Sequence, residues 1–220
     1  MNESSSVEVR DGHSLEAISF REYRPADLQR CVEITAAAWP ELTRGRLDVA
    51  TMEWYGWPAT WKEVVCVSDT AVGILFGKVN SDLGMFGRLR TPLTHAAVYL
   101  KMLFGLYGKI PRRLSFIKSG LVDDRDIAAH SPEVDGEIIY FVIDSAYRRK
   151  GIGKELMGRF IDHARKKGAR RVSVYTTEPG SDWMFYESYG FRKHSSFHDS
   201  FMTLVRNEEV KAMIYVLDIE

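Results

Sequence analysis

The hydrophobic and polar positions of this 220-residue chain predict alternating strands and helices over most of its length. Apolar and polar residues alternate through residues 18–23, as in a half-buried strand, and a helix is predicted from Pro25 to about Trp39. Two apolar runs at 64–67 and 71–79 are separated by a short polar turn, which is typical of a β-hairpin. The first part of the chain therefore predicts a strand, a helix and a hairpin.

The pattern is clearest from Glu137 onward. A nearly continuous apolar run indicates a buried strand, and the helical pattern after it has one apolar side and a glycine at its end. We expect, in chain order, a strand at 137–144, a helix at 151–167, a strand at 170–177, a short helix ending at Gly190 and a closing strand at 211–219.

Residues of about 81–136 interrupt this alternation. They include an amphipathic helical pattern at 94–110 and an acidic stretch with Asp123, Asp124 and Asp126. We interpret the segment as an insertion that borders a site, adds a packing layer or forms a contact between two copies of the chain. The acidic residues either attract a cationic ligand or lie on a solvated loop.

Composition and charge narrow the class of protein. The chain is 45% hydrophobic and 27% charged, with thirty basic and thirty acidic residues, so no overall field favours nucleic acid. The basic run at 165–171 is divided between a helix end and a strand start, which argues against nucleic-acid binding. Cys31 and Cys66 lie in apolar contexts without metal-binding spacing, so we expect reduced buried thiols and no metal site.

The chain start is polar and resembles no signal peptide. We expect residues 1–17 to form a flexible tail and the protein to be cytoplasmic. The longest apolar run, 96–107, is too short to span a bilayer, so no membrane partner is expected.

The candidate chemistry is concentrated at 147–156, YRRKGIGKEL, between a predicted strand and a predicted helix. A glycine turn there exposes backbone N–H groups at a helix N-terminus, which favours a phosphate ligand. The turn lacks the spacing of nucleotide-hydrolysing or dinucleotide-binding loops. The alternative is a tight connection with solvated cations. The motif residues are Arg148, Arg149, Lys150, Gly151, Ile152, Gly153 and Lys154.

The spacing Arg148-x-x-Gly151-x-Gly153 between a strand and a helix resembles the coenzyme-binding motif of the GNAT superfamily of acetyl-CoA-dependent N-acetyltransferases. WMFYESYGF at 183–191 is similar to a second family element, and residues 18–34 resemble the family's first strand and helix. The resemblance implies an α/β fold with a mixed, mostly antiparallel sheet of six to seven strands flanked by helices. The helical insertion would lie between the third and fourth strands of a single domain, 18–220.

The resemblance also implies how acetyl-CoA binds. The seven motif residues from Arg148 to Lys154 would hold the pyrophosphate. The strand before them would contact the pantetheine arm and the thioester through Phe141, Val142 and Ile143. Acetyl-CoA would be a co-substrate, with no metal.

Two residues are candidates for acid–base catalysis. By family position Tyr186 would protonate the leaving thiolate, and the alternative is a buried aromatic residue. Glu137 has the placement of the catalytic glutamate in histone-acetylating relatives, and the alternative is a strand-entry glutamate that stays in water. Weaker candidates for the base are His130, Asp144 and Glu178.

We therefore expect an N-acetyltransferase that transfers acetyl from acetyl-CoA to a primary amine of a small molecule or protein, by direct attack in a ternary complex. The alternative is a non-catalytic acyl-CoA-binding module that contacts a protein partner through its insertion. Trp54, Trp57 and Trp61 would wall an acceptor pocket or belong to the core. A homodimer is possible through the apolar residues of the insertion.

Overall fold

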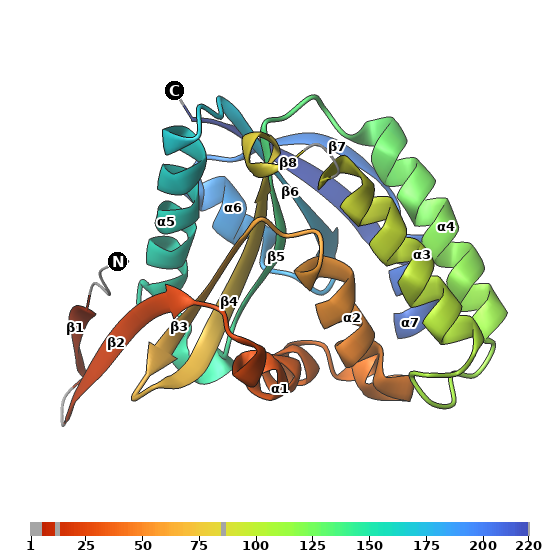
Figure 1. Cartoon of the computed structure of the whole chain (residues 1–220), viewed down its shortest axis with the longest axis horizontal. Coiled ribbons are helices and arrows are strands. Elements are labelled where there is room, and N and C mark those ends of the chain that lie inside the picture. Colours follow the sequence, from red (N-terminus) through yellow and green to blue (C-terminus); the bar gives the residue numbers. More distant parts are fainter. Residues whose placement is uncertain (1–5, 12–13, 85–86, 220) are drawn as a thin grey trace.

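The computed structural model describes residues 6–11, 14–84 and 87–219, and these residues form one mixed sheet covered by helices on both faces (Figure 1). The described strands follow the order β1-β2-β3-β4-β5-β6-β8-β7, and all neighbours are antiparallel except β5 and β6. The strands are β1 (Ser6–Asp11), β2 (Ser14–Glu22), β3 (Trp61–Val67), β4 (Thr70–Val79), β5 (Gly136–Ile143), β6 (Arg171–Glu178), β7 (Arg192–His198) and β8 (Lys211–Asp218).

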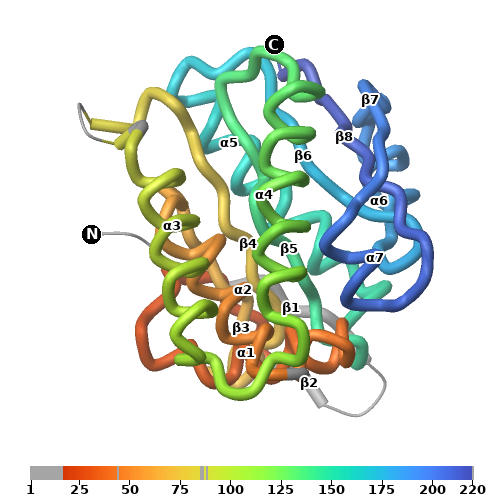
Figure 2. Tube along the Cα trace, turned by 90° about the vertical axis from the view of Figure 1, so that its right-hand side faces the viewer, coloured from red at the N-terminus to blue at the C-terminus, as the bar shows by residue number. Residues whose placement is uncertain are grey.

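Helices are divided between the two faces of the sheet. The described α-helices are α1 (Leu28–Ala38), α2 (Leu47–Gly56), α3 (Arg90–Leu103), α4 (Arg113–His130), α5 (Ile152–Lys166), α6 (Trp183–Tyr189) and α7 (Ser200–Arg206). One hydrophobic cluster joins α5 and α6 to one face, and two further clusters join α1, α2, α3 and α7 on the other. In Figures 1 and 2, α3 and α4 run side by side on this second face. We call the two faces the α5 face and the α2 face.

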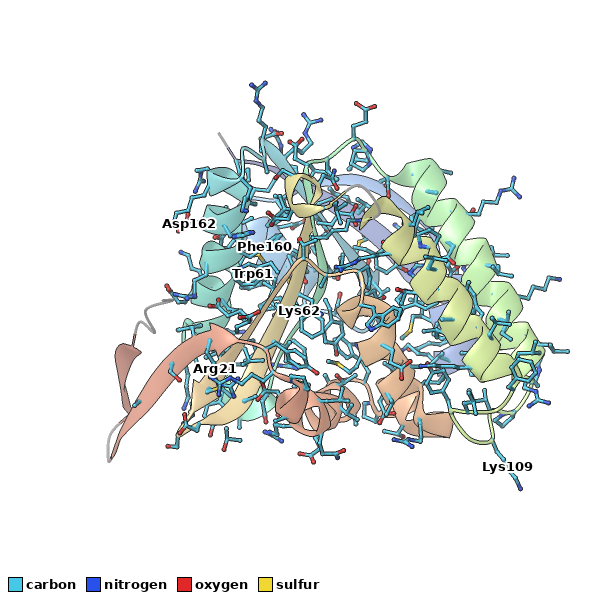
Figure 3. The ribbon with its side chains drawn as sticks, viewed as in Figure 1. Arg21, Trp61, Lys62, Lys109, Phe160 and Asp162 are labelled. Atoms are coloured by element: carbon cyan, nitrogen blue, oxygen red, sulfur yellow. The ribbon has the colours of Figure 1, made fainter. Side chains whose placement is uncertain are left out.

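A continuous apolar stripe along α5 packs this helix against the sheet. Leu156, Met157 and Phe160 of α5 have no exposed surface, because their spacing puts them on one side of the helix. Gly77 in β4 has no side chain, and a Cβ there would lie 2.1 Å from the Phe160 ring. Trp61 of β3 packs beside the same ring, with centroids 5.3 Å apart (Figure 3).

Strands β5 and β6 separate soon after they begin. They pair in parallel over three residues only, ending with Ile138 opposite Val174. Beyond that pair β5 continues to Ile143 and β6 to Glu178, so the two strands diverge. We call this opening between β5 and β6 the fork. Backbone N–H and C=O groups that would otherwise pair between the two strands face the fork, where a ligand can form hydrogen bonds with them.

The fold class predicted from the sequence is confirmed, including helices inserted between the hairpin and the strand that leads to the glycine turn. The described sheet has eight strands rather than six or seven, because β1 lies in the predicted tail and β7 has no clear alternation. Asp123 and Asp124 lie on α4 instead of a loop. The limits of the single domain and the flexibility of the tail stay predictions. No helix among the described residues is long and apolar enough to cross a membrane.

Candidate active site

The glycine turn joins the end of β5 to the start of α5. Its backbone is left-handed at two points, with φ of 66° at Arg149 and 80° at Gly151. A Cβ at Gly151 would meet nothing within 4 Å, so glycine is needed there for its backbone angle rather than for space. The Gly151 carbonyl accepts the first helical bond, from the N–H of Glu155 at 3.1 Å. The turn therefore aims the first N–H groups of a 15-residue helix outward.

Close contact between α5 and β5 brings these N–H groups to the open end of the fork. A Cβ at Gly153 would lie 3.3 Å from the Phe141 ring and 3.6 Å from Ile143. A larger residue would push the helix N-terminus away from the strand. The second glycine of the motif is thus needed for close approach, whereas the first is needed for its turn.

The cations of the motif do not all point the same way. Arg148 donates from Nε to the carbonyl of Ile143 at 2.9 Å, which ties the turn to the end of β5. The ammonium of Lys150 lies 5.6 Å from the centre of the Tyr147 ring. Arg149 and Lys154 are exposed. The turn is therefore cationic at its surface, and one of its four cations also supports the strand.

Two of the three predicted strand residues turn their backbone toward the fork. The N–H of Asp144 donates to Val72 in β4 at 2.8 Å, so alternate residues from there face β4. Val142 accordingly faces β4, whereas Phe141 and Ile143 face the fork. The coenzyme-binding roles of the strand and motif residues stay predictions.

Tyr186 lies on the α5 face, where α6 packs beside α5. It is 8% exposed and contacts the rings of Phe185, Phe191 and Tyr215. Burial raises the pKa of its phenol well above the usual value, so the hydroxyl keeps its proton at neutral pH. This hydroxyl makes no hydrogen bond to any residue that the structure describes. It is therefore available to an added partner.

Glu137 lies on the opposite face. Its neighbour Ile138 packs in the α5-face core, so alternation turns Glu137 toward the α2 face. There it forms an ion pair with Lys78 at 3.0 Å and borders a surface hollow with Asp135 and Arg171. Tyr186 and Glu137 thus lie on the two sides of the sheet, and the fork is the opening between β5 and β6 through which the two sides meet.

The three weaker candidates for the catalytic base lie in environments that differ from that of Glu137. Asp144 accepts the N–H of Ala146 at 3.1 Å and pairs with Arg30 at 2.5 Å, so it caps the turn after β5. His130 is exposed, and its ring stacks on Phe197. Glu178 is exposed at the end of β6. Asp144 is thus a structural residue of the turn.

The three tryptophans do not form one wall. Trp54 stacks on His95 of α3 with ring centroids 3.5 Å apart, whereas Trp61 packs against Phe160 on the other face. Trp57 is 69% exposed. Of the three, Trp54 packs between the helices of the α2 face.

Sequence reasoning missed most of a group that we call the tyrosine–aspartate cluster, on the α2 face beside the fork. The sequence shows that Asp123 and Asp124 are acidic, but no pattern in it links them to tyrosines far away along the chain. The sequence gives only a weak indication of the cluster. Tyr175 follows the core residue Val174 in β6, so its side chain lies on the opposite face of the strand. The cluster consists of Tyr55, Tyr99, Asp123, Asp124, Tyr175 and Asp199.

Comparisons with known proteins support this description of the fold and the glycine turn. Residues 116–191 match the model of the Acetyltransferase (GNAT) family, a segment that includes the fork, the glycine turn and α6. SsHAT has 16% sequence identity and a TM-score of 0.63, covering 92% of this chain and 98% of its own. The ribosomal-protein-S18-alanine N-acetyltransferase from Escherichia coli has 13% identity and a TM-score of 0.55, covering 92% and 94%. Ard1 from Thermoplasma volcanium has 16% identity and a TM-score of 0.52, and the match covers 92% of this chain and 98% of its own. No curated protein matches the chain.

The resemblance to the GNAT superfamily is therefore confirmed: the chain has the GNAT fold and carries a segment that matches the family's model. The family match supports acyl transfer as the general chemistry. At these identities the structural likeness shows the fold alone and leaves the acceptor open. Among the described residues, no group of three or more His, Cys, Asp or Glu side chains is arranged to hold a metal ion.

Proposed function

We propose that the protein is an N-acetyltransferase that moves an acetyl group from acetyl-CoA to a primary amine of a small molecule or a protein. The observation that carries the proposal is the fork, with the N-terminus of α5 at its open end. A diphosphate suits the outward N–H groups and the surface cations of the turn. An extended arm suits the strand backbone that faces the fork.

Binding would use the start of α5 and the end of β5 for different parts of the coenzyme. The N–H groups of Ile152 and Gly153 would hold phosphate oxygens, and the backbone of Phe141 and Ile143 would hold the pantetheine arm. A β5 amide that faces the fork would stabilise the oxyanion formed at the thioester carbonyl. The binding energy would mainly bring the amine and the thioester together.

The reaction would proceed by direct attack in a ternary complex. The amine nitrogen forms a bond to the carbonyl carbon, the tetrahedral intermediate collapses and the carbon–sulfur bond breaks. The proton lost by the amine passes to Glu137 through water, and the hydroxyl of Tyr186 gives a proton to the departing thiolate. The unpartnered hydroxyl of Tyr186 supports this assignment, because it holds its proton at neutral pH and donates it to no residue that the structure describes.

The arrangement of the two faces supports these roles. An amine that approaches from the α2 face and a thiolate that leaves on the α5 face would have a base and an acid on their own sides. Neither proton would need to cross the sheet. Asp144, in contrast, is occupied by Arg30 and by the turn that it caps.

The test is turnover by the purified chain with acetyl-CoA and a set of primary amines, followed as thiol release and product mass. Tyr186→Phe is expected to lower kcat by about 10²-fold or more, within the usual range for general acid catalysis, while the affinity for coenzyme A persists. Tyr189→Phe is the matched control, because it removes a hydroxyl from the same short helix. Equal loss in both variants would contradict the role of Tyr186.

Coenzyme binding without turnover of any amine or peptide would contradict the enzyme proposal. That result would leave a module that binds acyl-CoA and contacts another protein. Absence of coenzyme binding would contradict both functions. Location in the cytoplasm and formation of a homodimer also stay predictions.

A further inference from the structure

The tyrosine–aspartate cluster contains two buried carboxyl groups that have no lysine or arginine partner among the described residues. Asp199 is 1% exposed and Asp123 is 6% exposed. Asp123 accepts the backbone N–H groups of Ser200 and Phe201, both at 2.8 Å. Asp199 accepts the hydroxyl of Tyr175 and the N–H of Met202. These donors are all neutral, so they satisfy the carboxyl oxygens without supplying a positive charge.

Asp124 extends the same surface toward α3. It accepts the hydroxyl of Tyr99 at 3.0 Å and lies 3.1 Å from Nδ1 of His95, whose ring stacks on Trp54. Among the described residues no lysine or arginine forms a salt bridge with any of the three aspartates. A buried anionic group of this kind is a natural site for a cation that the chain itself does not supply.

Helix capping explains only part of this arrangement. Asp199 is the N-cap of α7, and Asp123 binds two further N–H groups at the start of the same helix. Together the two carboxylates accept three of the N–H groups that the helix start leaves free, those of Ser200, Phe201 and Met202. Capping does not account for the tyrosine side chains around them.

Tyr55 of α2 connects the cluster to β5. Its ring stacks on Tyr140 of β5, with centroids 5.5 Å apart, which puts it beside the fork. Burial raises the pKa of its hydroxyl, and the charges of Asp199, Asp124 and Asp123 add to this shift. This hydroxyl makes no hydrogen bond to any part of the chain that the structure describes.

The position of the charges decides which cation fits. Carboxylates around the reacting nitrogen would favour its protonated form and slow its attack on the thioester. The same carboxylates at a short distance from the fork would hold a second cation of the acceptor while the reacting amine stays neutral. Tyrosine faces and hydroxyls suit such an ammonium group through cation–π contact and hydrogen bonding.

We propose that the acceptor is a small-molecule amine with a second cationic group, of which an alkyl diamine is the simplest case. The tyrosine–aspartate cluster binds the cation that does not react and leaves the other nitrogen at the fork. The proposal rests on the proposed acetyltransferase function. It deepens that function by naming the acceptor class and the residues that select it.

The experiment compares 1,4-diaminobutane with butan-1-amine, which has the same chain length and lacks the second cation. With the full chain and acetyl-CoA, we expect kcat/KM for the diamine to exceed that for the monoamine by about tenfold or more. The difference should lie mainly in KM and should weaken with added salt. Equal kcat/KM for the two amines would overturn the proposal.

Variants assign the preference to the cluster. Tyr55→Phe loses no hydrogen bond within the described chain and should fold normally, and Asp124→Asn keeps the shape of its side chain. Each is expected to reduce the diamine-to-monoamine ratio by several-fold. Asp126→Asn is the control, because it makes the same charge change on the same helix outside the cluster. A ratio that falls equally in the control would also overturn the proposal.

The two proposals can fail separately. If monoamines are acetylated as well as diamines, the chain is an acetyltransferase and the acceptor class is wrong. If no amine is acetylated, calorimetry with 1,4-diaminobutane and butan-1-amine still tests the cluster. Selective binding of the diamine, lost in Tyr55→Phe, would support the cation site alone, and equal or absent binding would overturn it.

Discussion

Gly151 and Gly168 flank helix α5, and both have a φ of 80° with nothing within 4 Å of a Cβ built on them. The same backbone requirement thus applies at both ends of one helix. Only Gly151 stands at the N-terminus, beside the open end of the fork. The same substitution at each of the two glycines therefore separates the loss of stability caused by backbone strain from an effect on ligand binding.

Gly151→Asp is expected to weaken coenzyme A binding by about tenfold or more, because a carboxylate would repel the phosphates that the turn is proposed to hold. Gly168→Asp should lose a similar amount of stability, about 1–2 kcal/mol from the left-handed angle, and keep its coenzyme affinity. Calorimetry with coenzyme A and thermal unfolding without ligand measure the two effects. Matching affinity losses would show that only folding is disturbed.

The ion pair between Arg159 and Glu63 joins α5 to β3. It has two bonds, Nε to Oε2 at 2.8 Å and Nη2 to Oε1 at 2.7 Å, and Glu63 is 8% exposed. Glu63→Gln should lower the free energy of unfolding by about 1–3 kcal/mol, because a partly buried guanidinium loses its charged partner. Urea unfolding measures this loss. Glu155→Gln, on an exposed position of α5, should change stability by less than about 0.5 kcal/mol.

The glycine turn and its flanking elements could be predicted because their signals are local. A buried strand, two glycines and a one-sided helix follow one another at 137–167, and the structure has β5, the turn and α5 there. Other elements give weaker signals. In β7 five of seven residues are exposed, so the strand has no apolar alternation, and α4 buries little more than Gly120 and Asp123.

The tyrosine–aspartate cluster could not be predicted because the fold assembles it from distant segments. Tyr55 and Asp199 lie on α2 and before α7, and Asp123 comes from the insertion between them. The face of Tyr140 also depends on tertiary structure, since the pairing of β4 with β5 shifts register between Phe76 and Gly77. A simple alternation from Ile138 would place Tyr140 on the α5 face, whereas it packs on the α2 face.

Asp144→Asn tests whether this residue is structural or catalytic. The change removes the charge that pairs with Arg30, and the amide oxygen can still accept the N–H of Ala146. We expect stability to fall by about 1 kcal/mol or less, as for other partly exposed ion pairs, and kcat to stay the same. Steady-state turnover below the unfolding temperature measures this. A fall in kcat of tenfold or more in folded protein would instead make Asp144 a candidate base.

The pH dependence of stability should report on Asp123. Burial, followed by the charge of Asp199, raises its pKa from 3.8 to about 7, and the two backbone N–H donors only partly oppose this. Asp124 follows Asp123 on α4 and contacts His95 of α3. Between about pH 4 and 7 the folded chain therefore holds a proton that the unfolded chain has released. This carboxyl makes folding less favourable as pH rises through that window, by up to about 1.4 kcal/mol per pH unit.

Asp123→Asn removes the titration and leaves a constant cost, because its side chain can accept through one oxygen only. The stability of the variant relative to the native chain should therefore improve as pH rises from 5 to 8. Urea unfolding at several pH values measures the difference, and groups that titrate equally in both chains cancel. Asp126→Asn should give a difference that hardly varies with pH. The same flat result for Asp123→Asn would mean that its carboxyl is already ionised at pH 5, and that the cluster carries its full negative charge across this range.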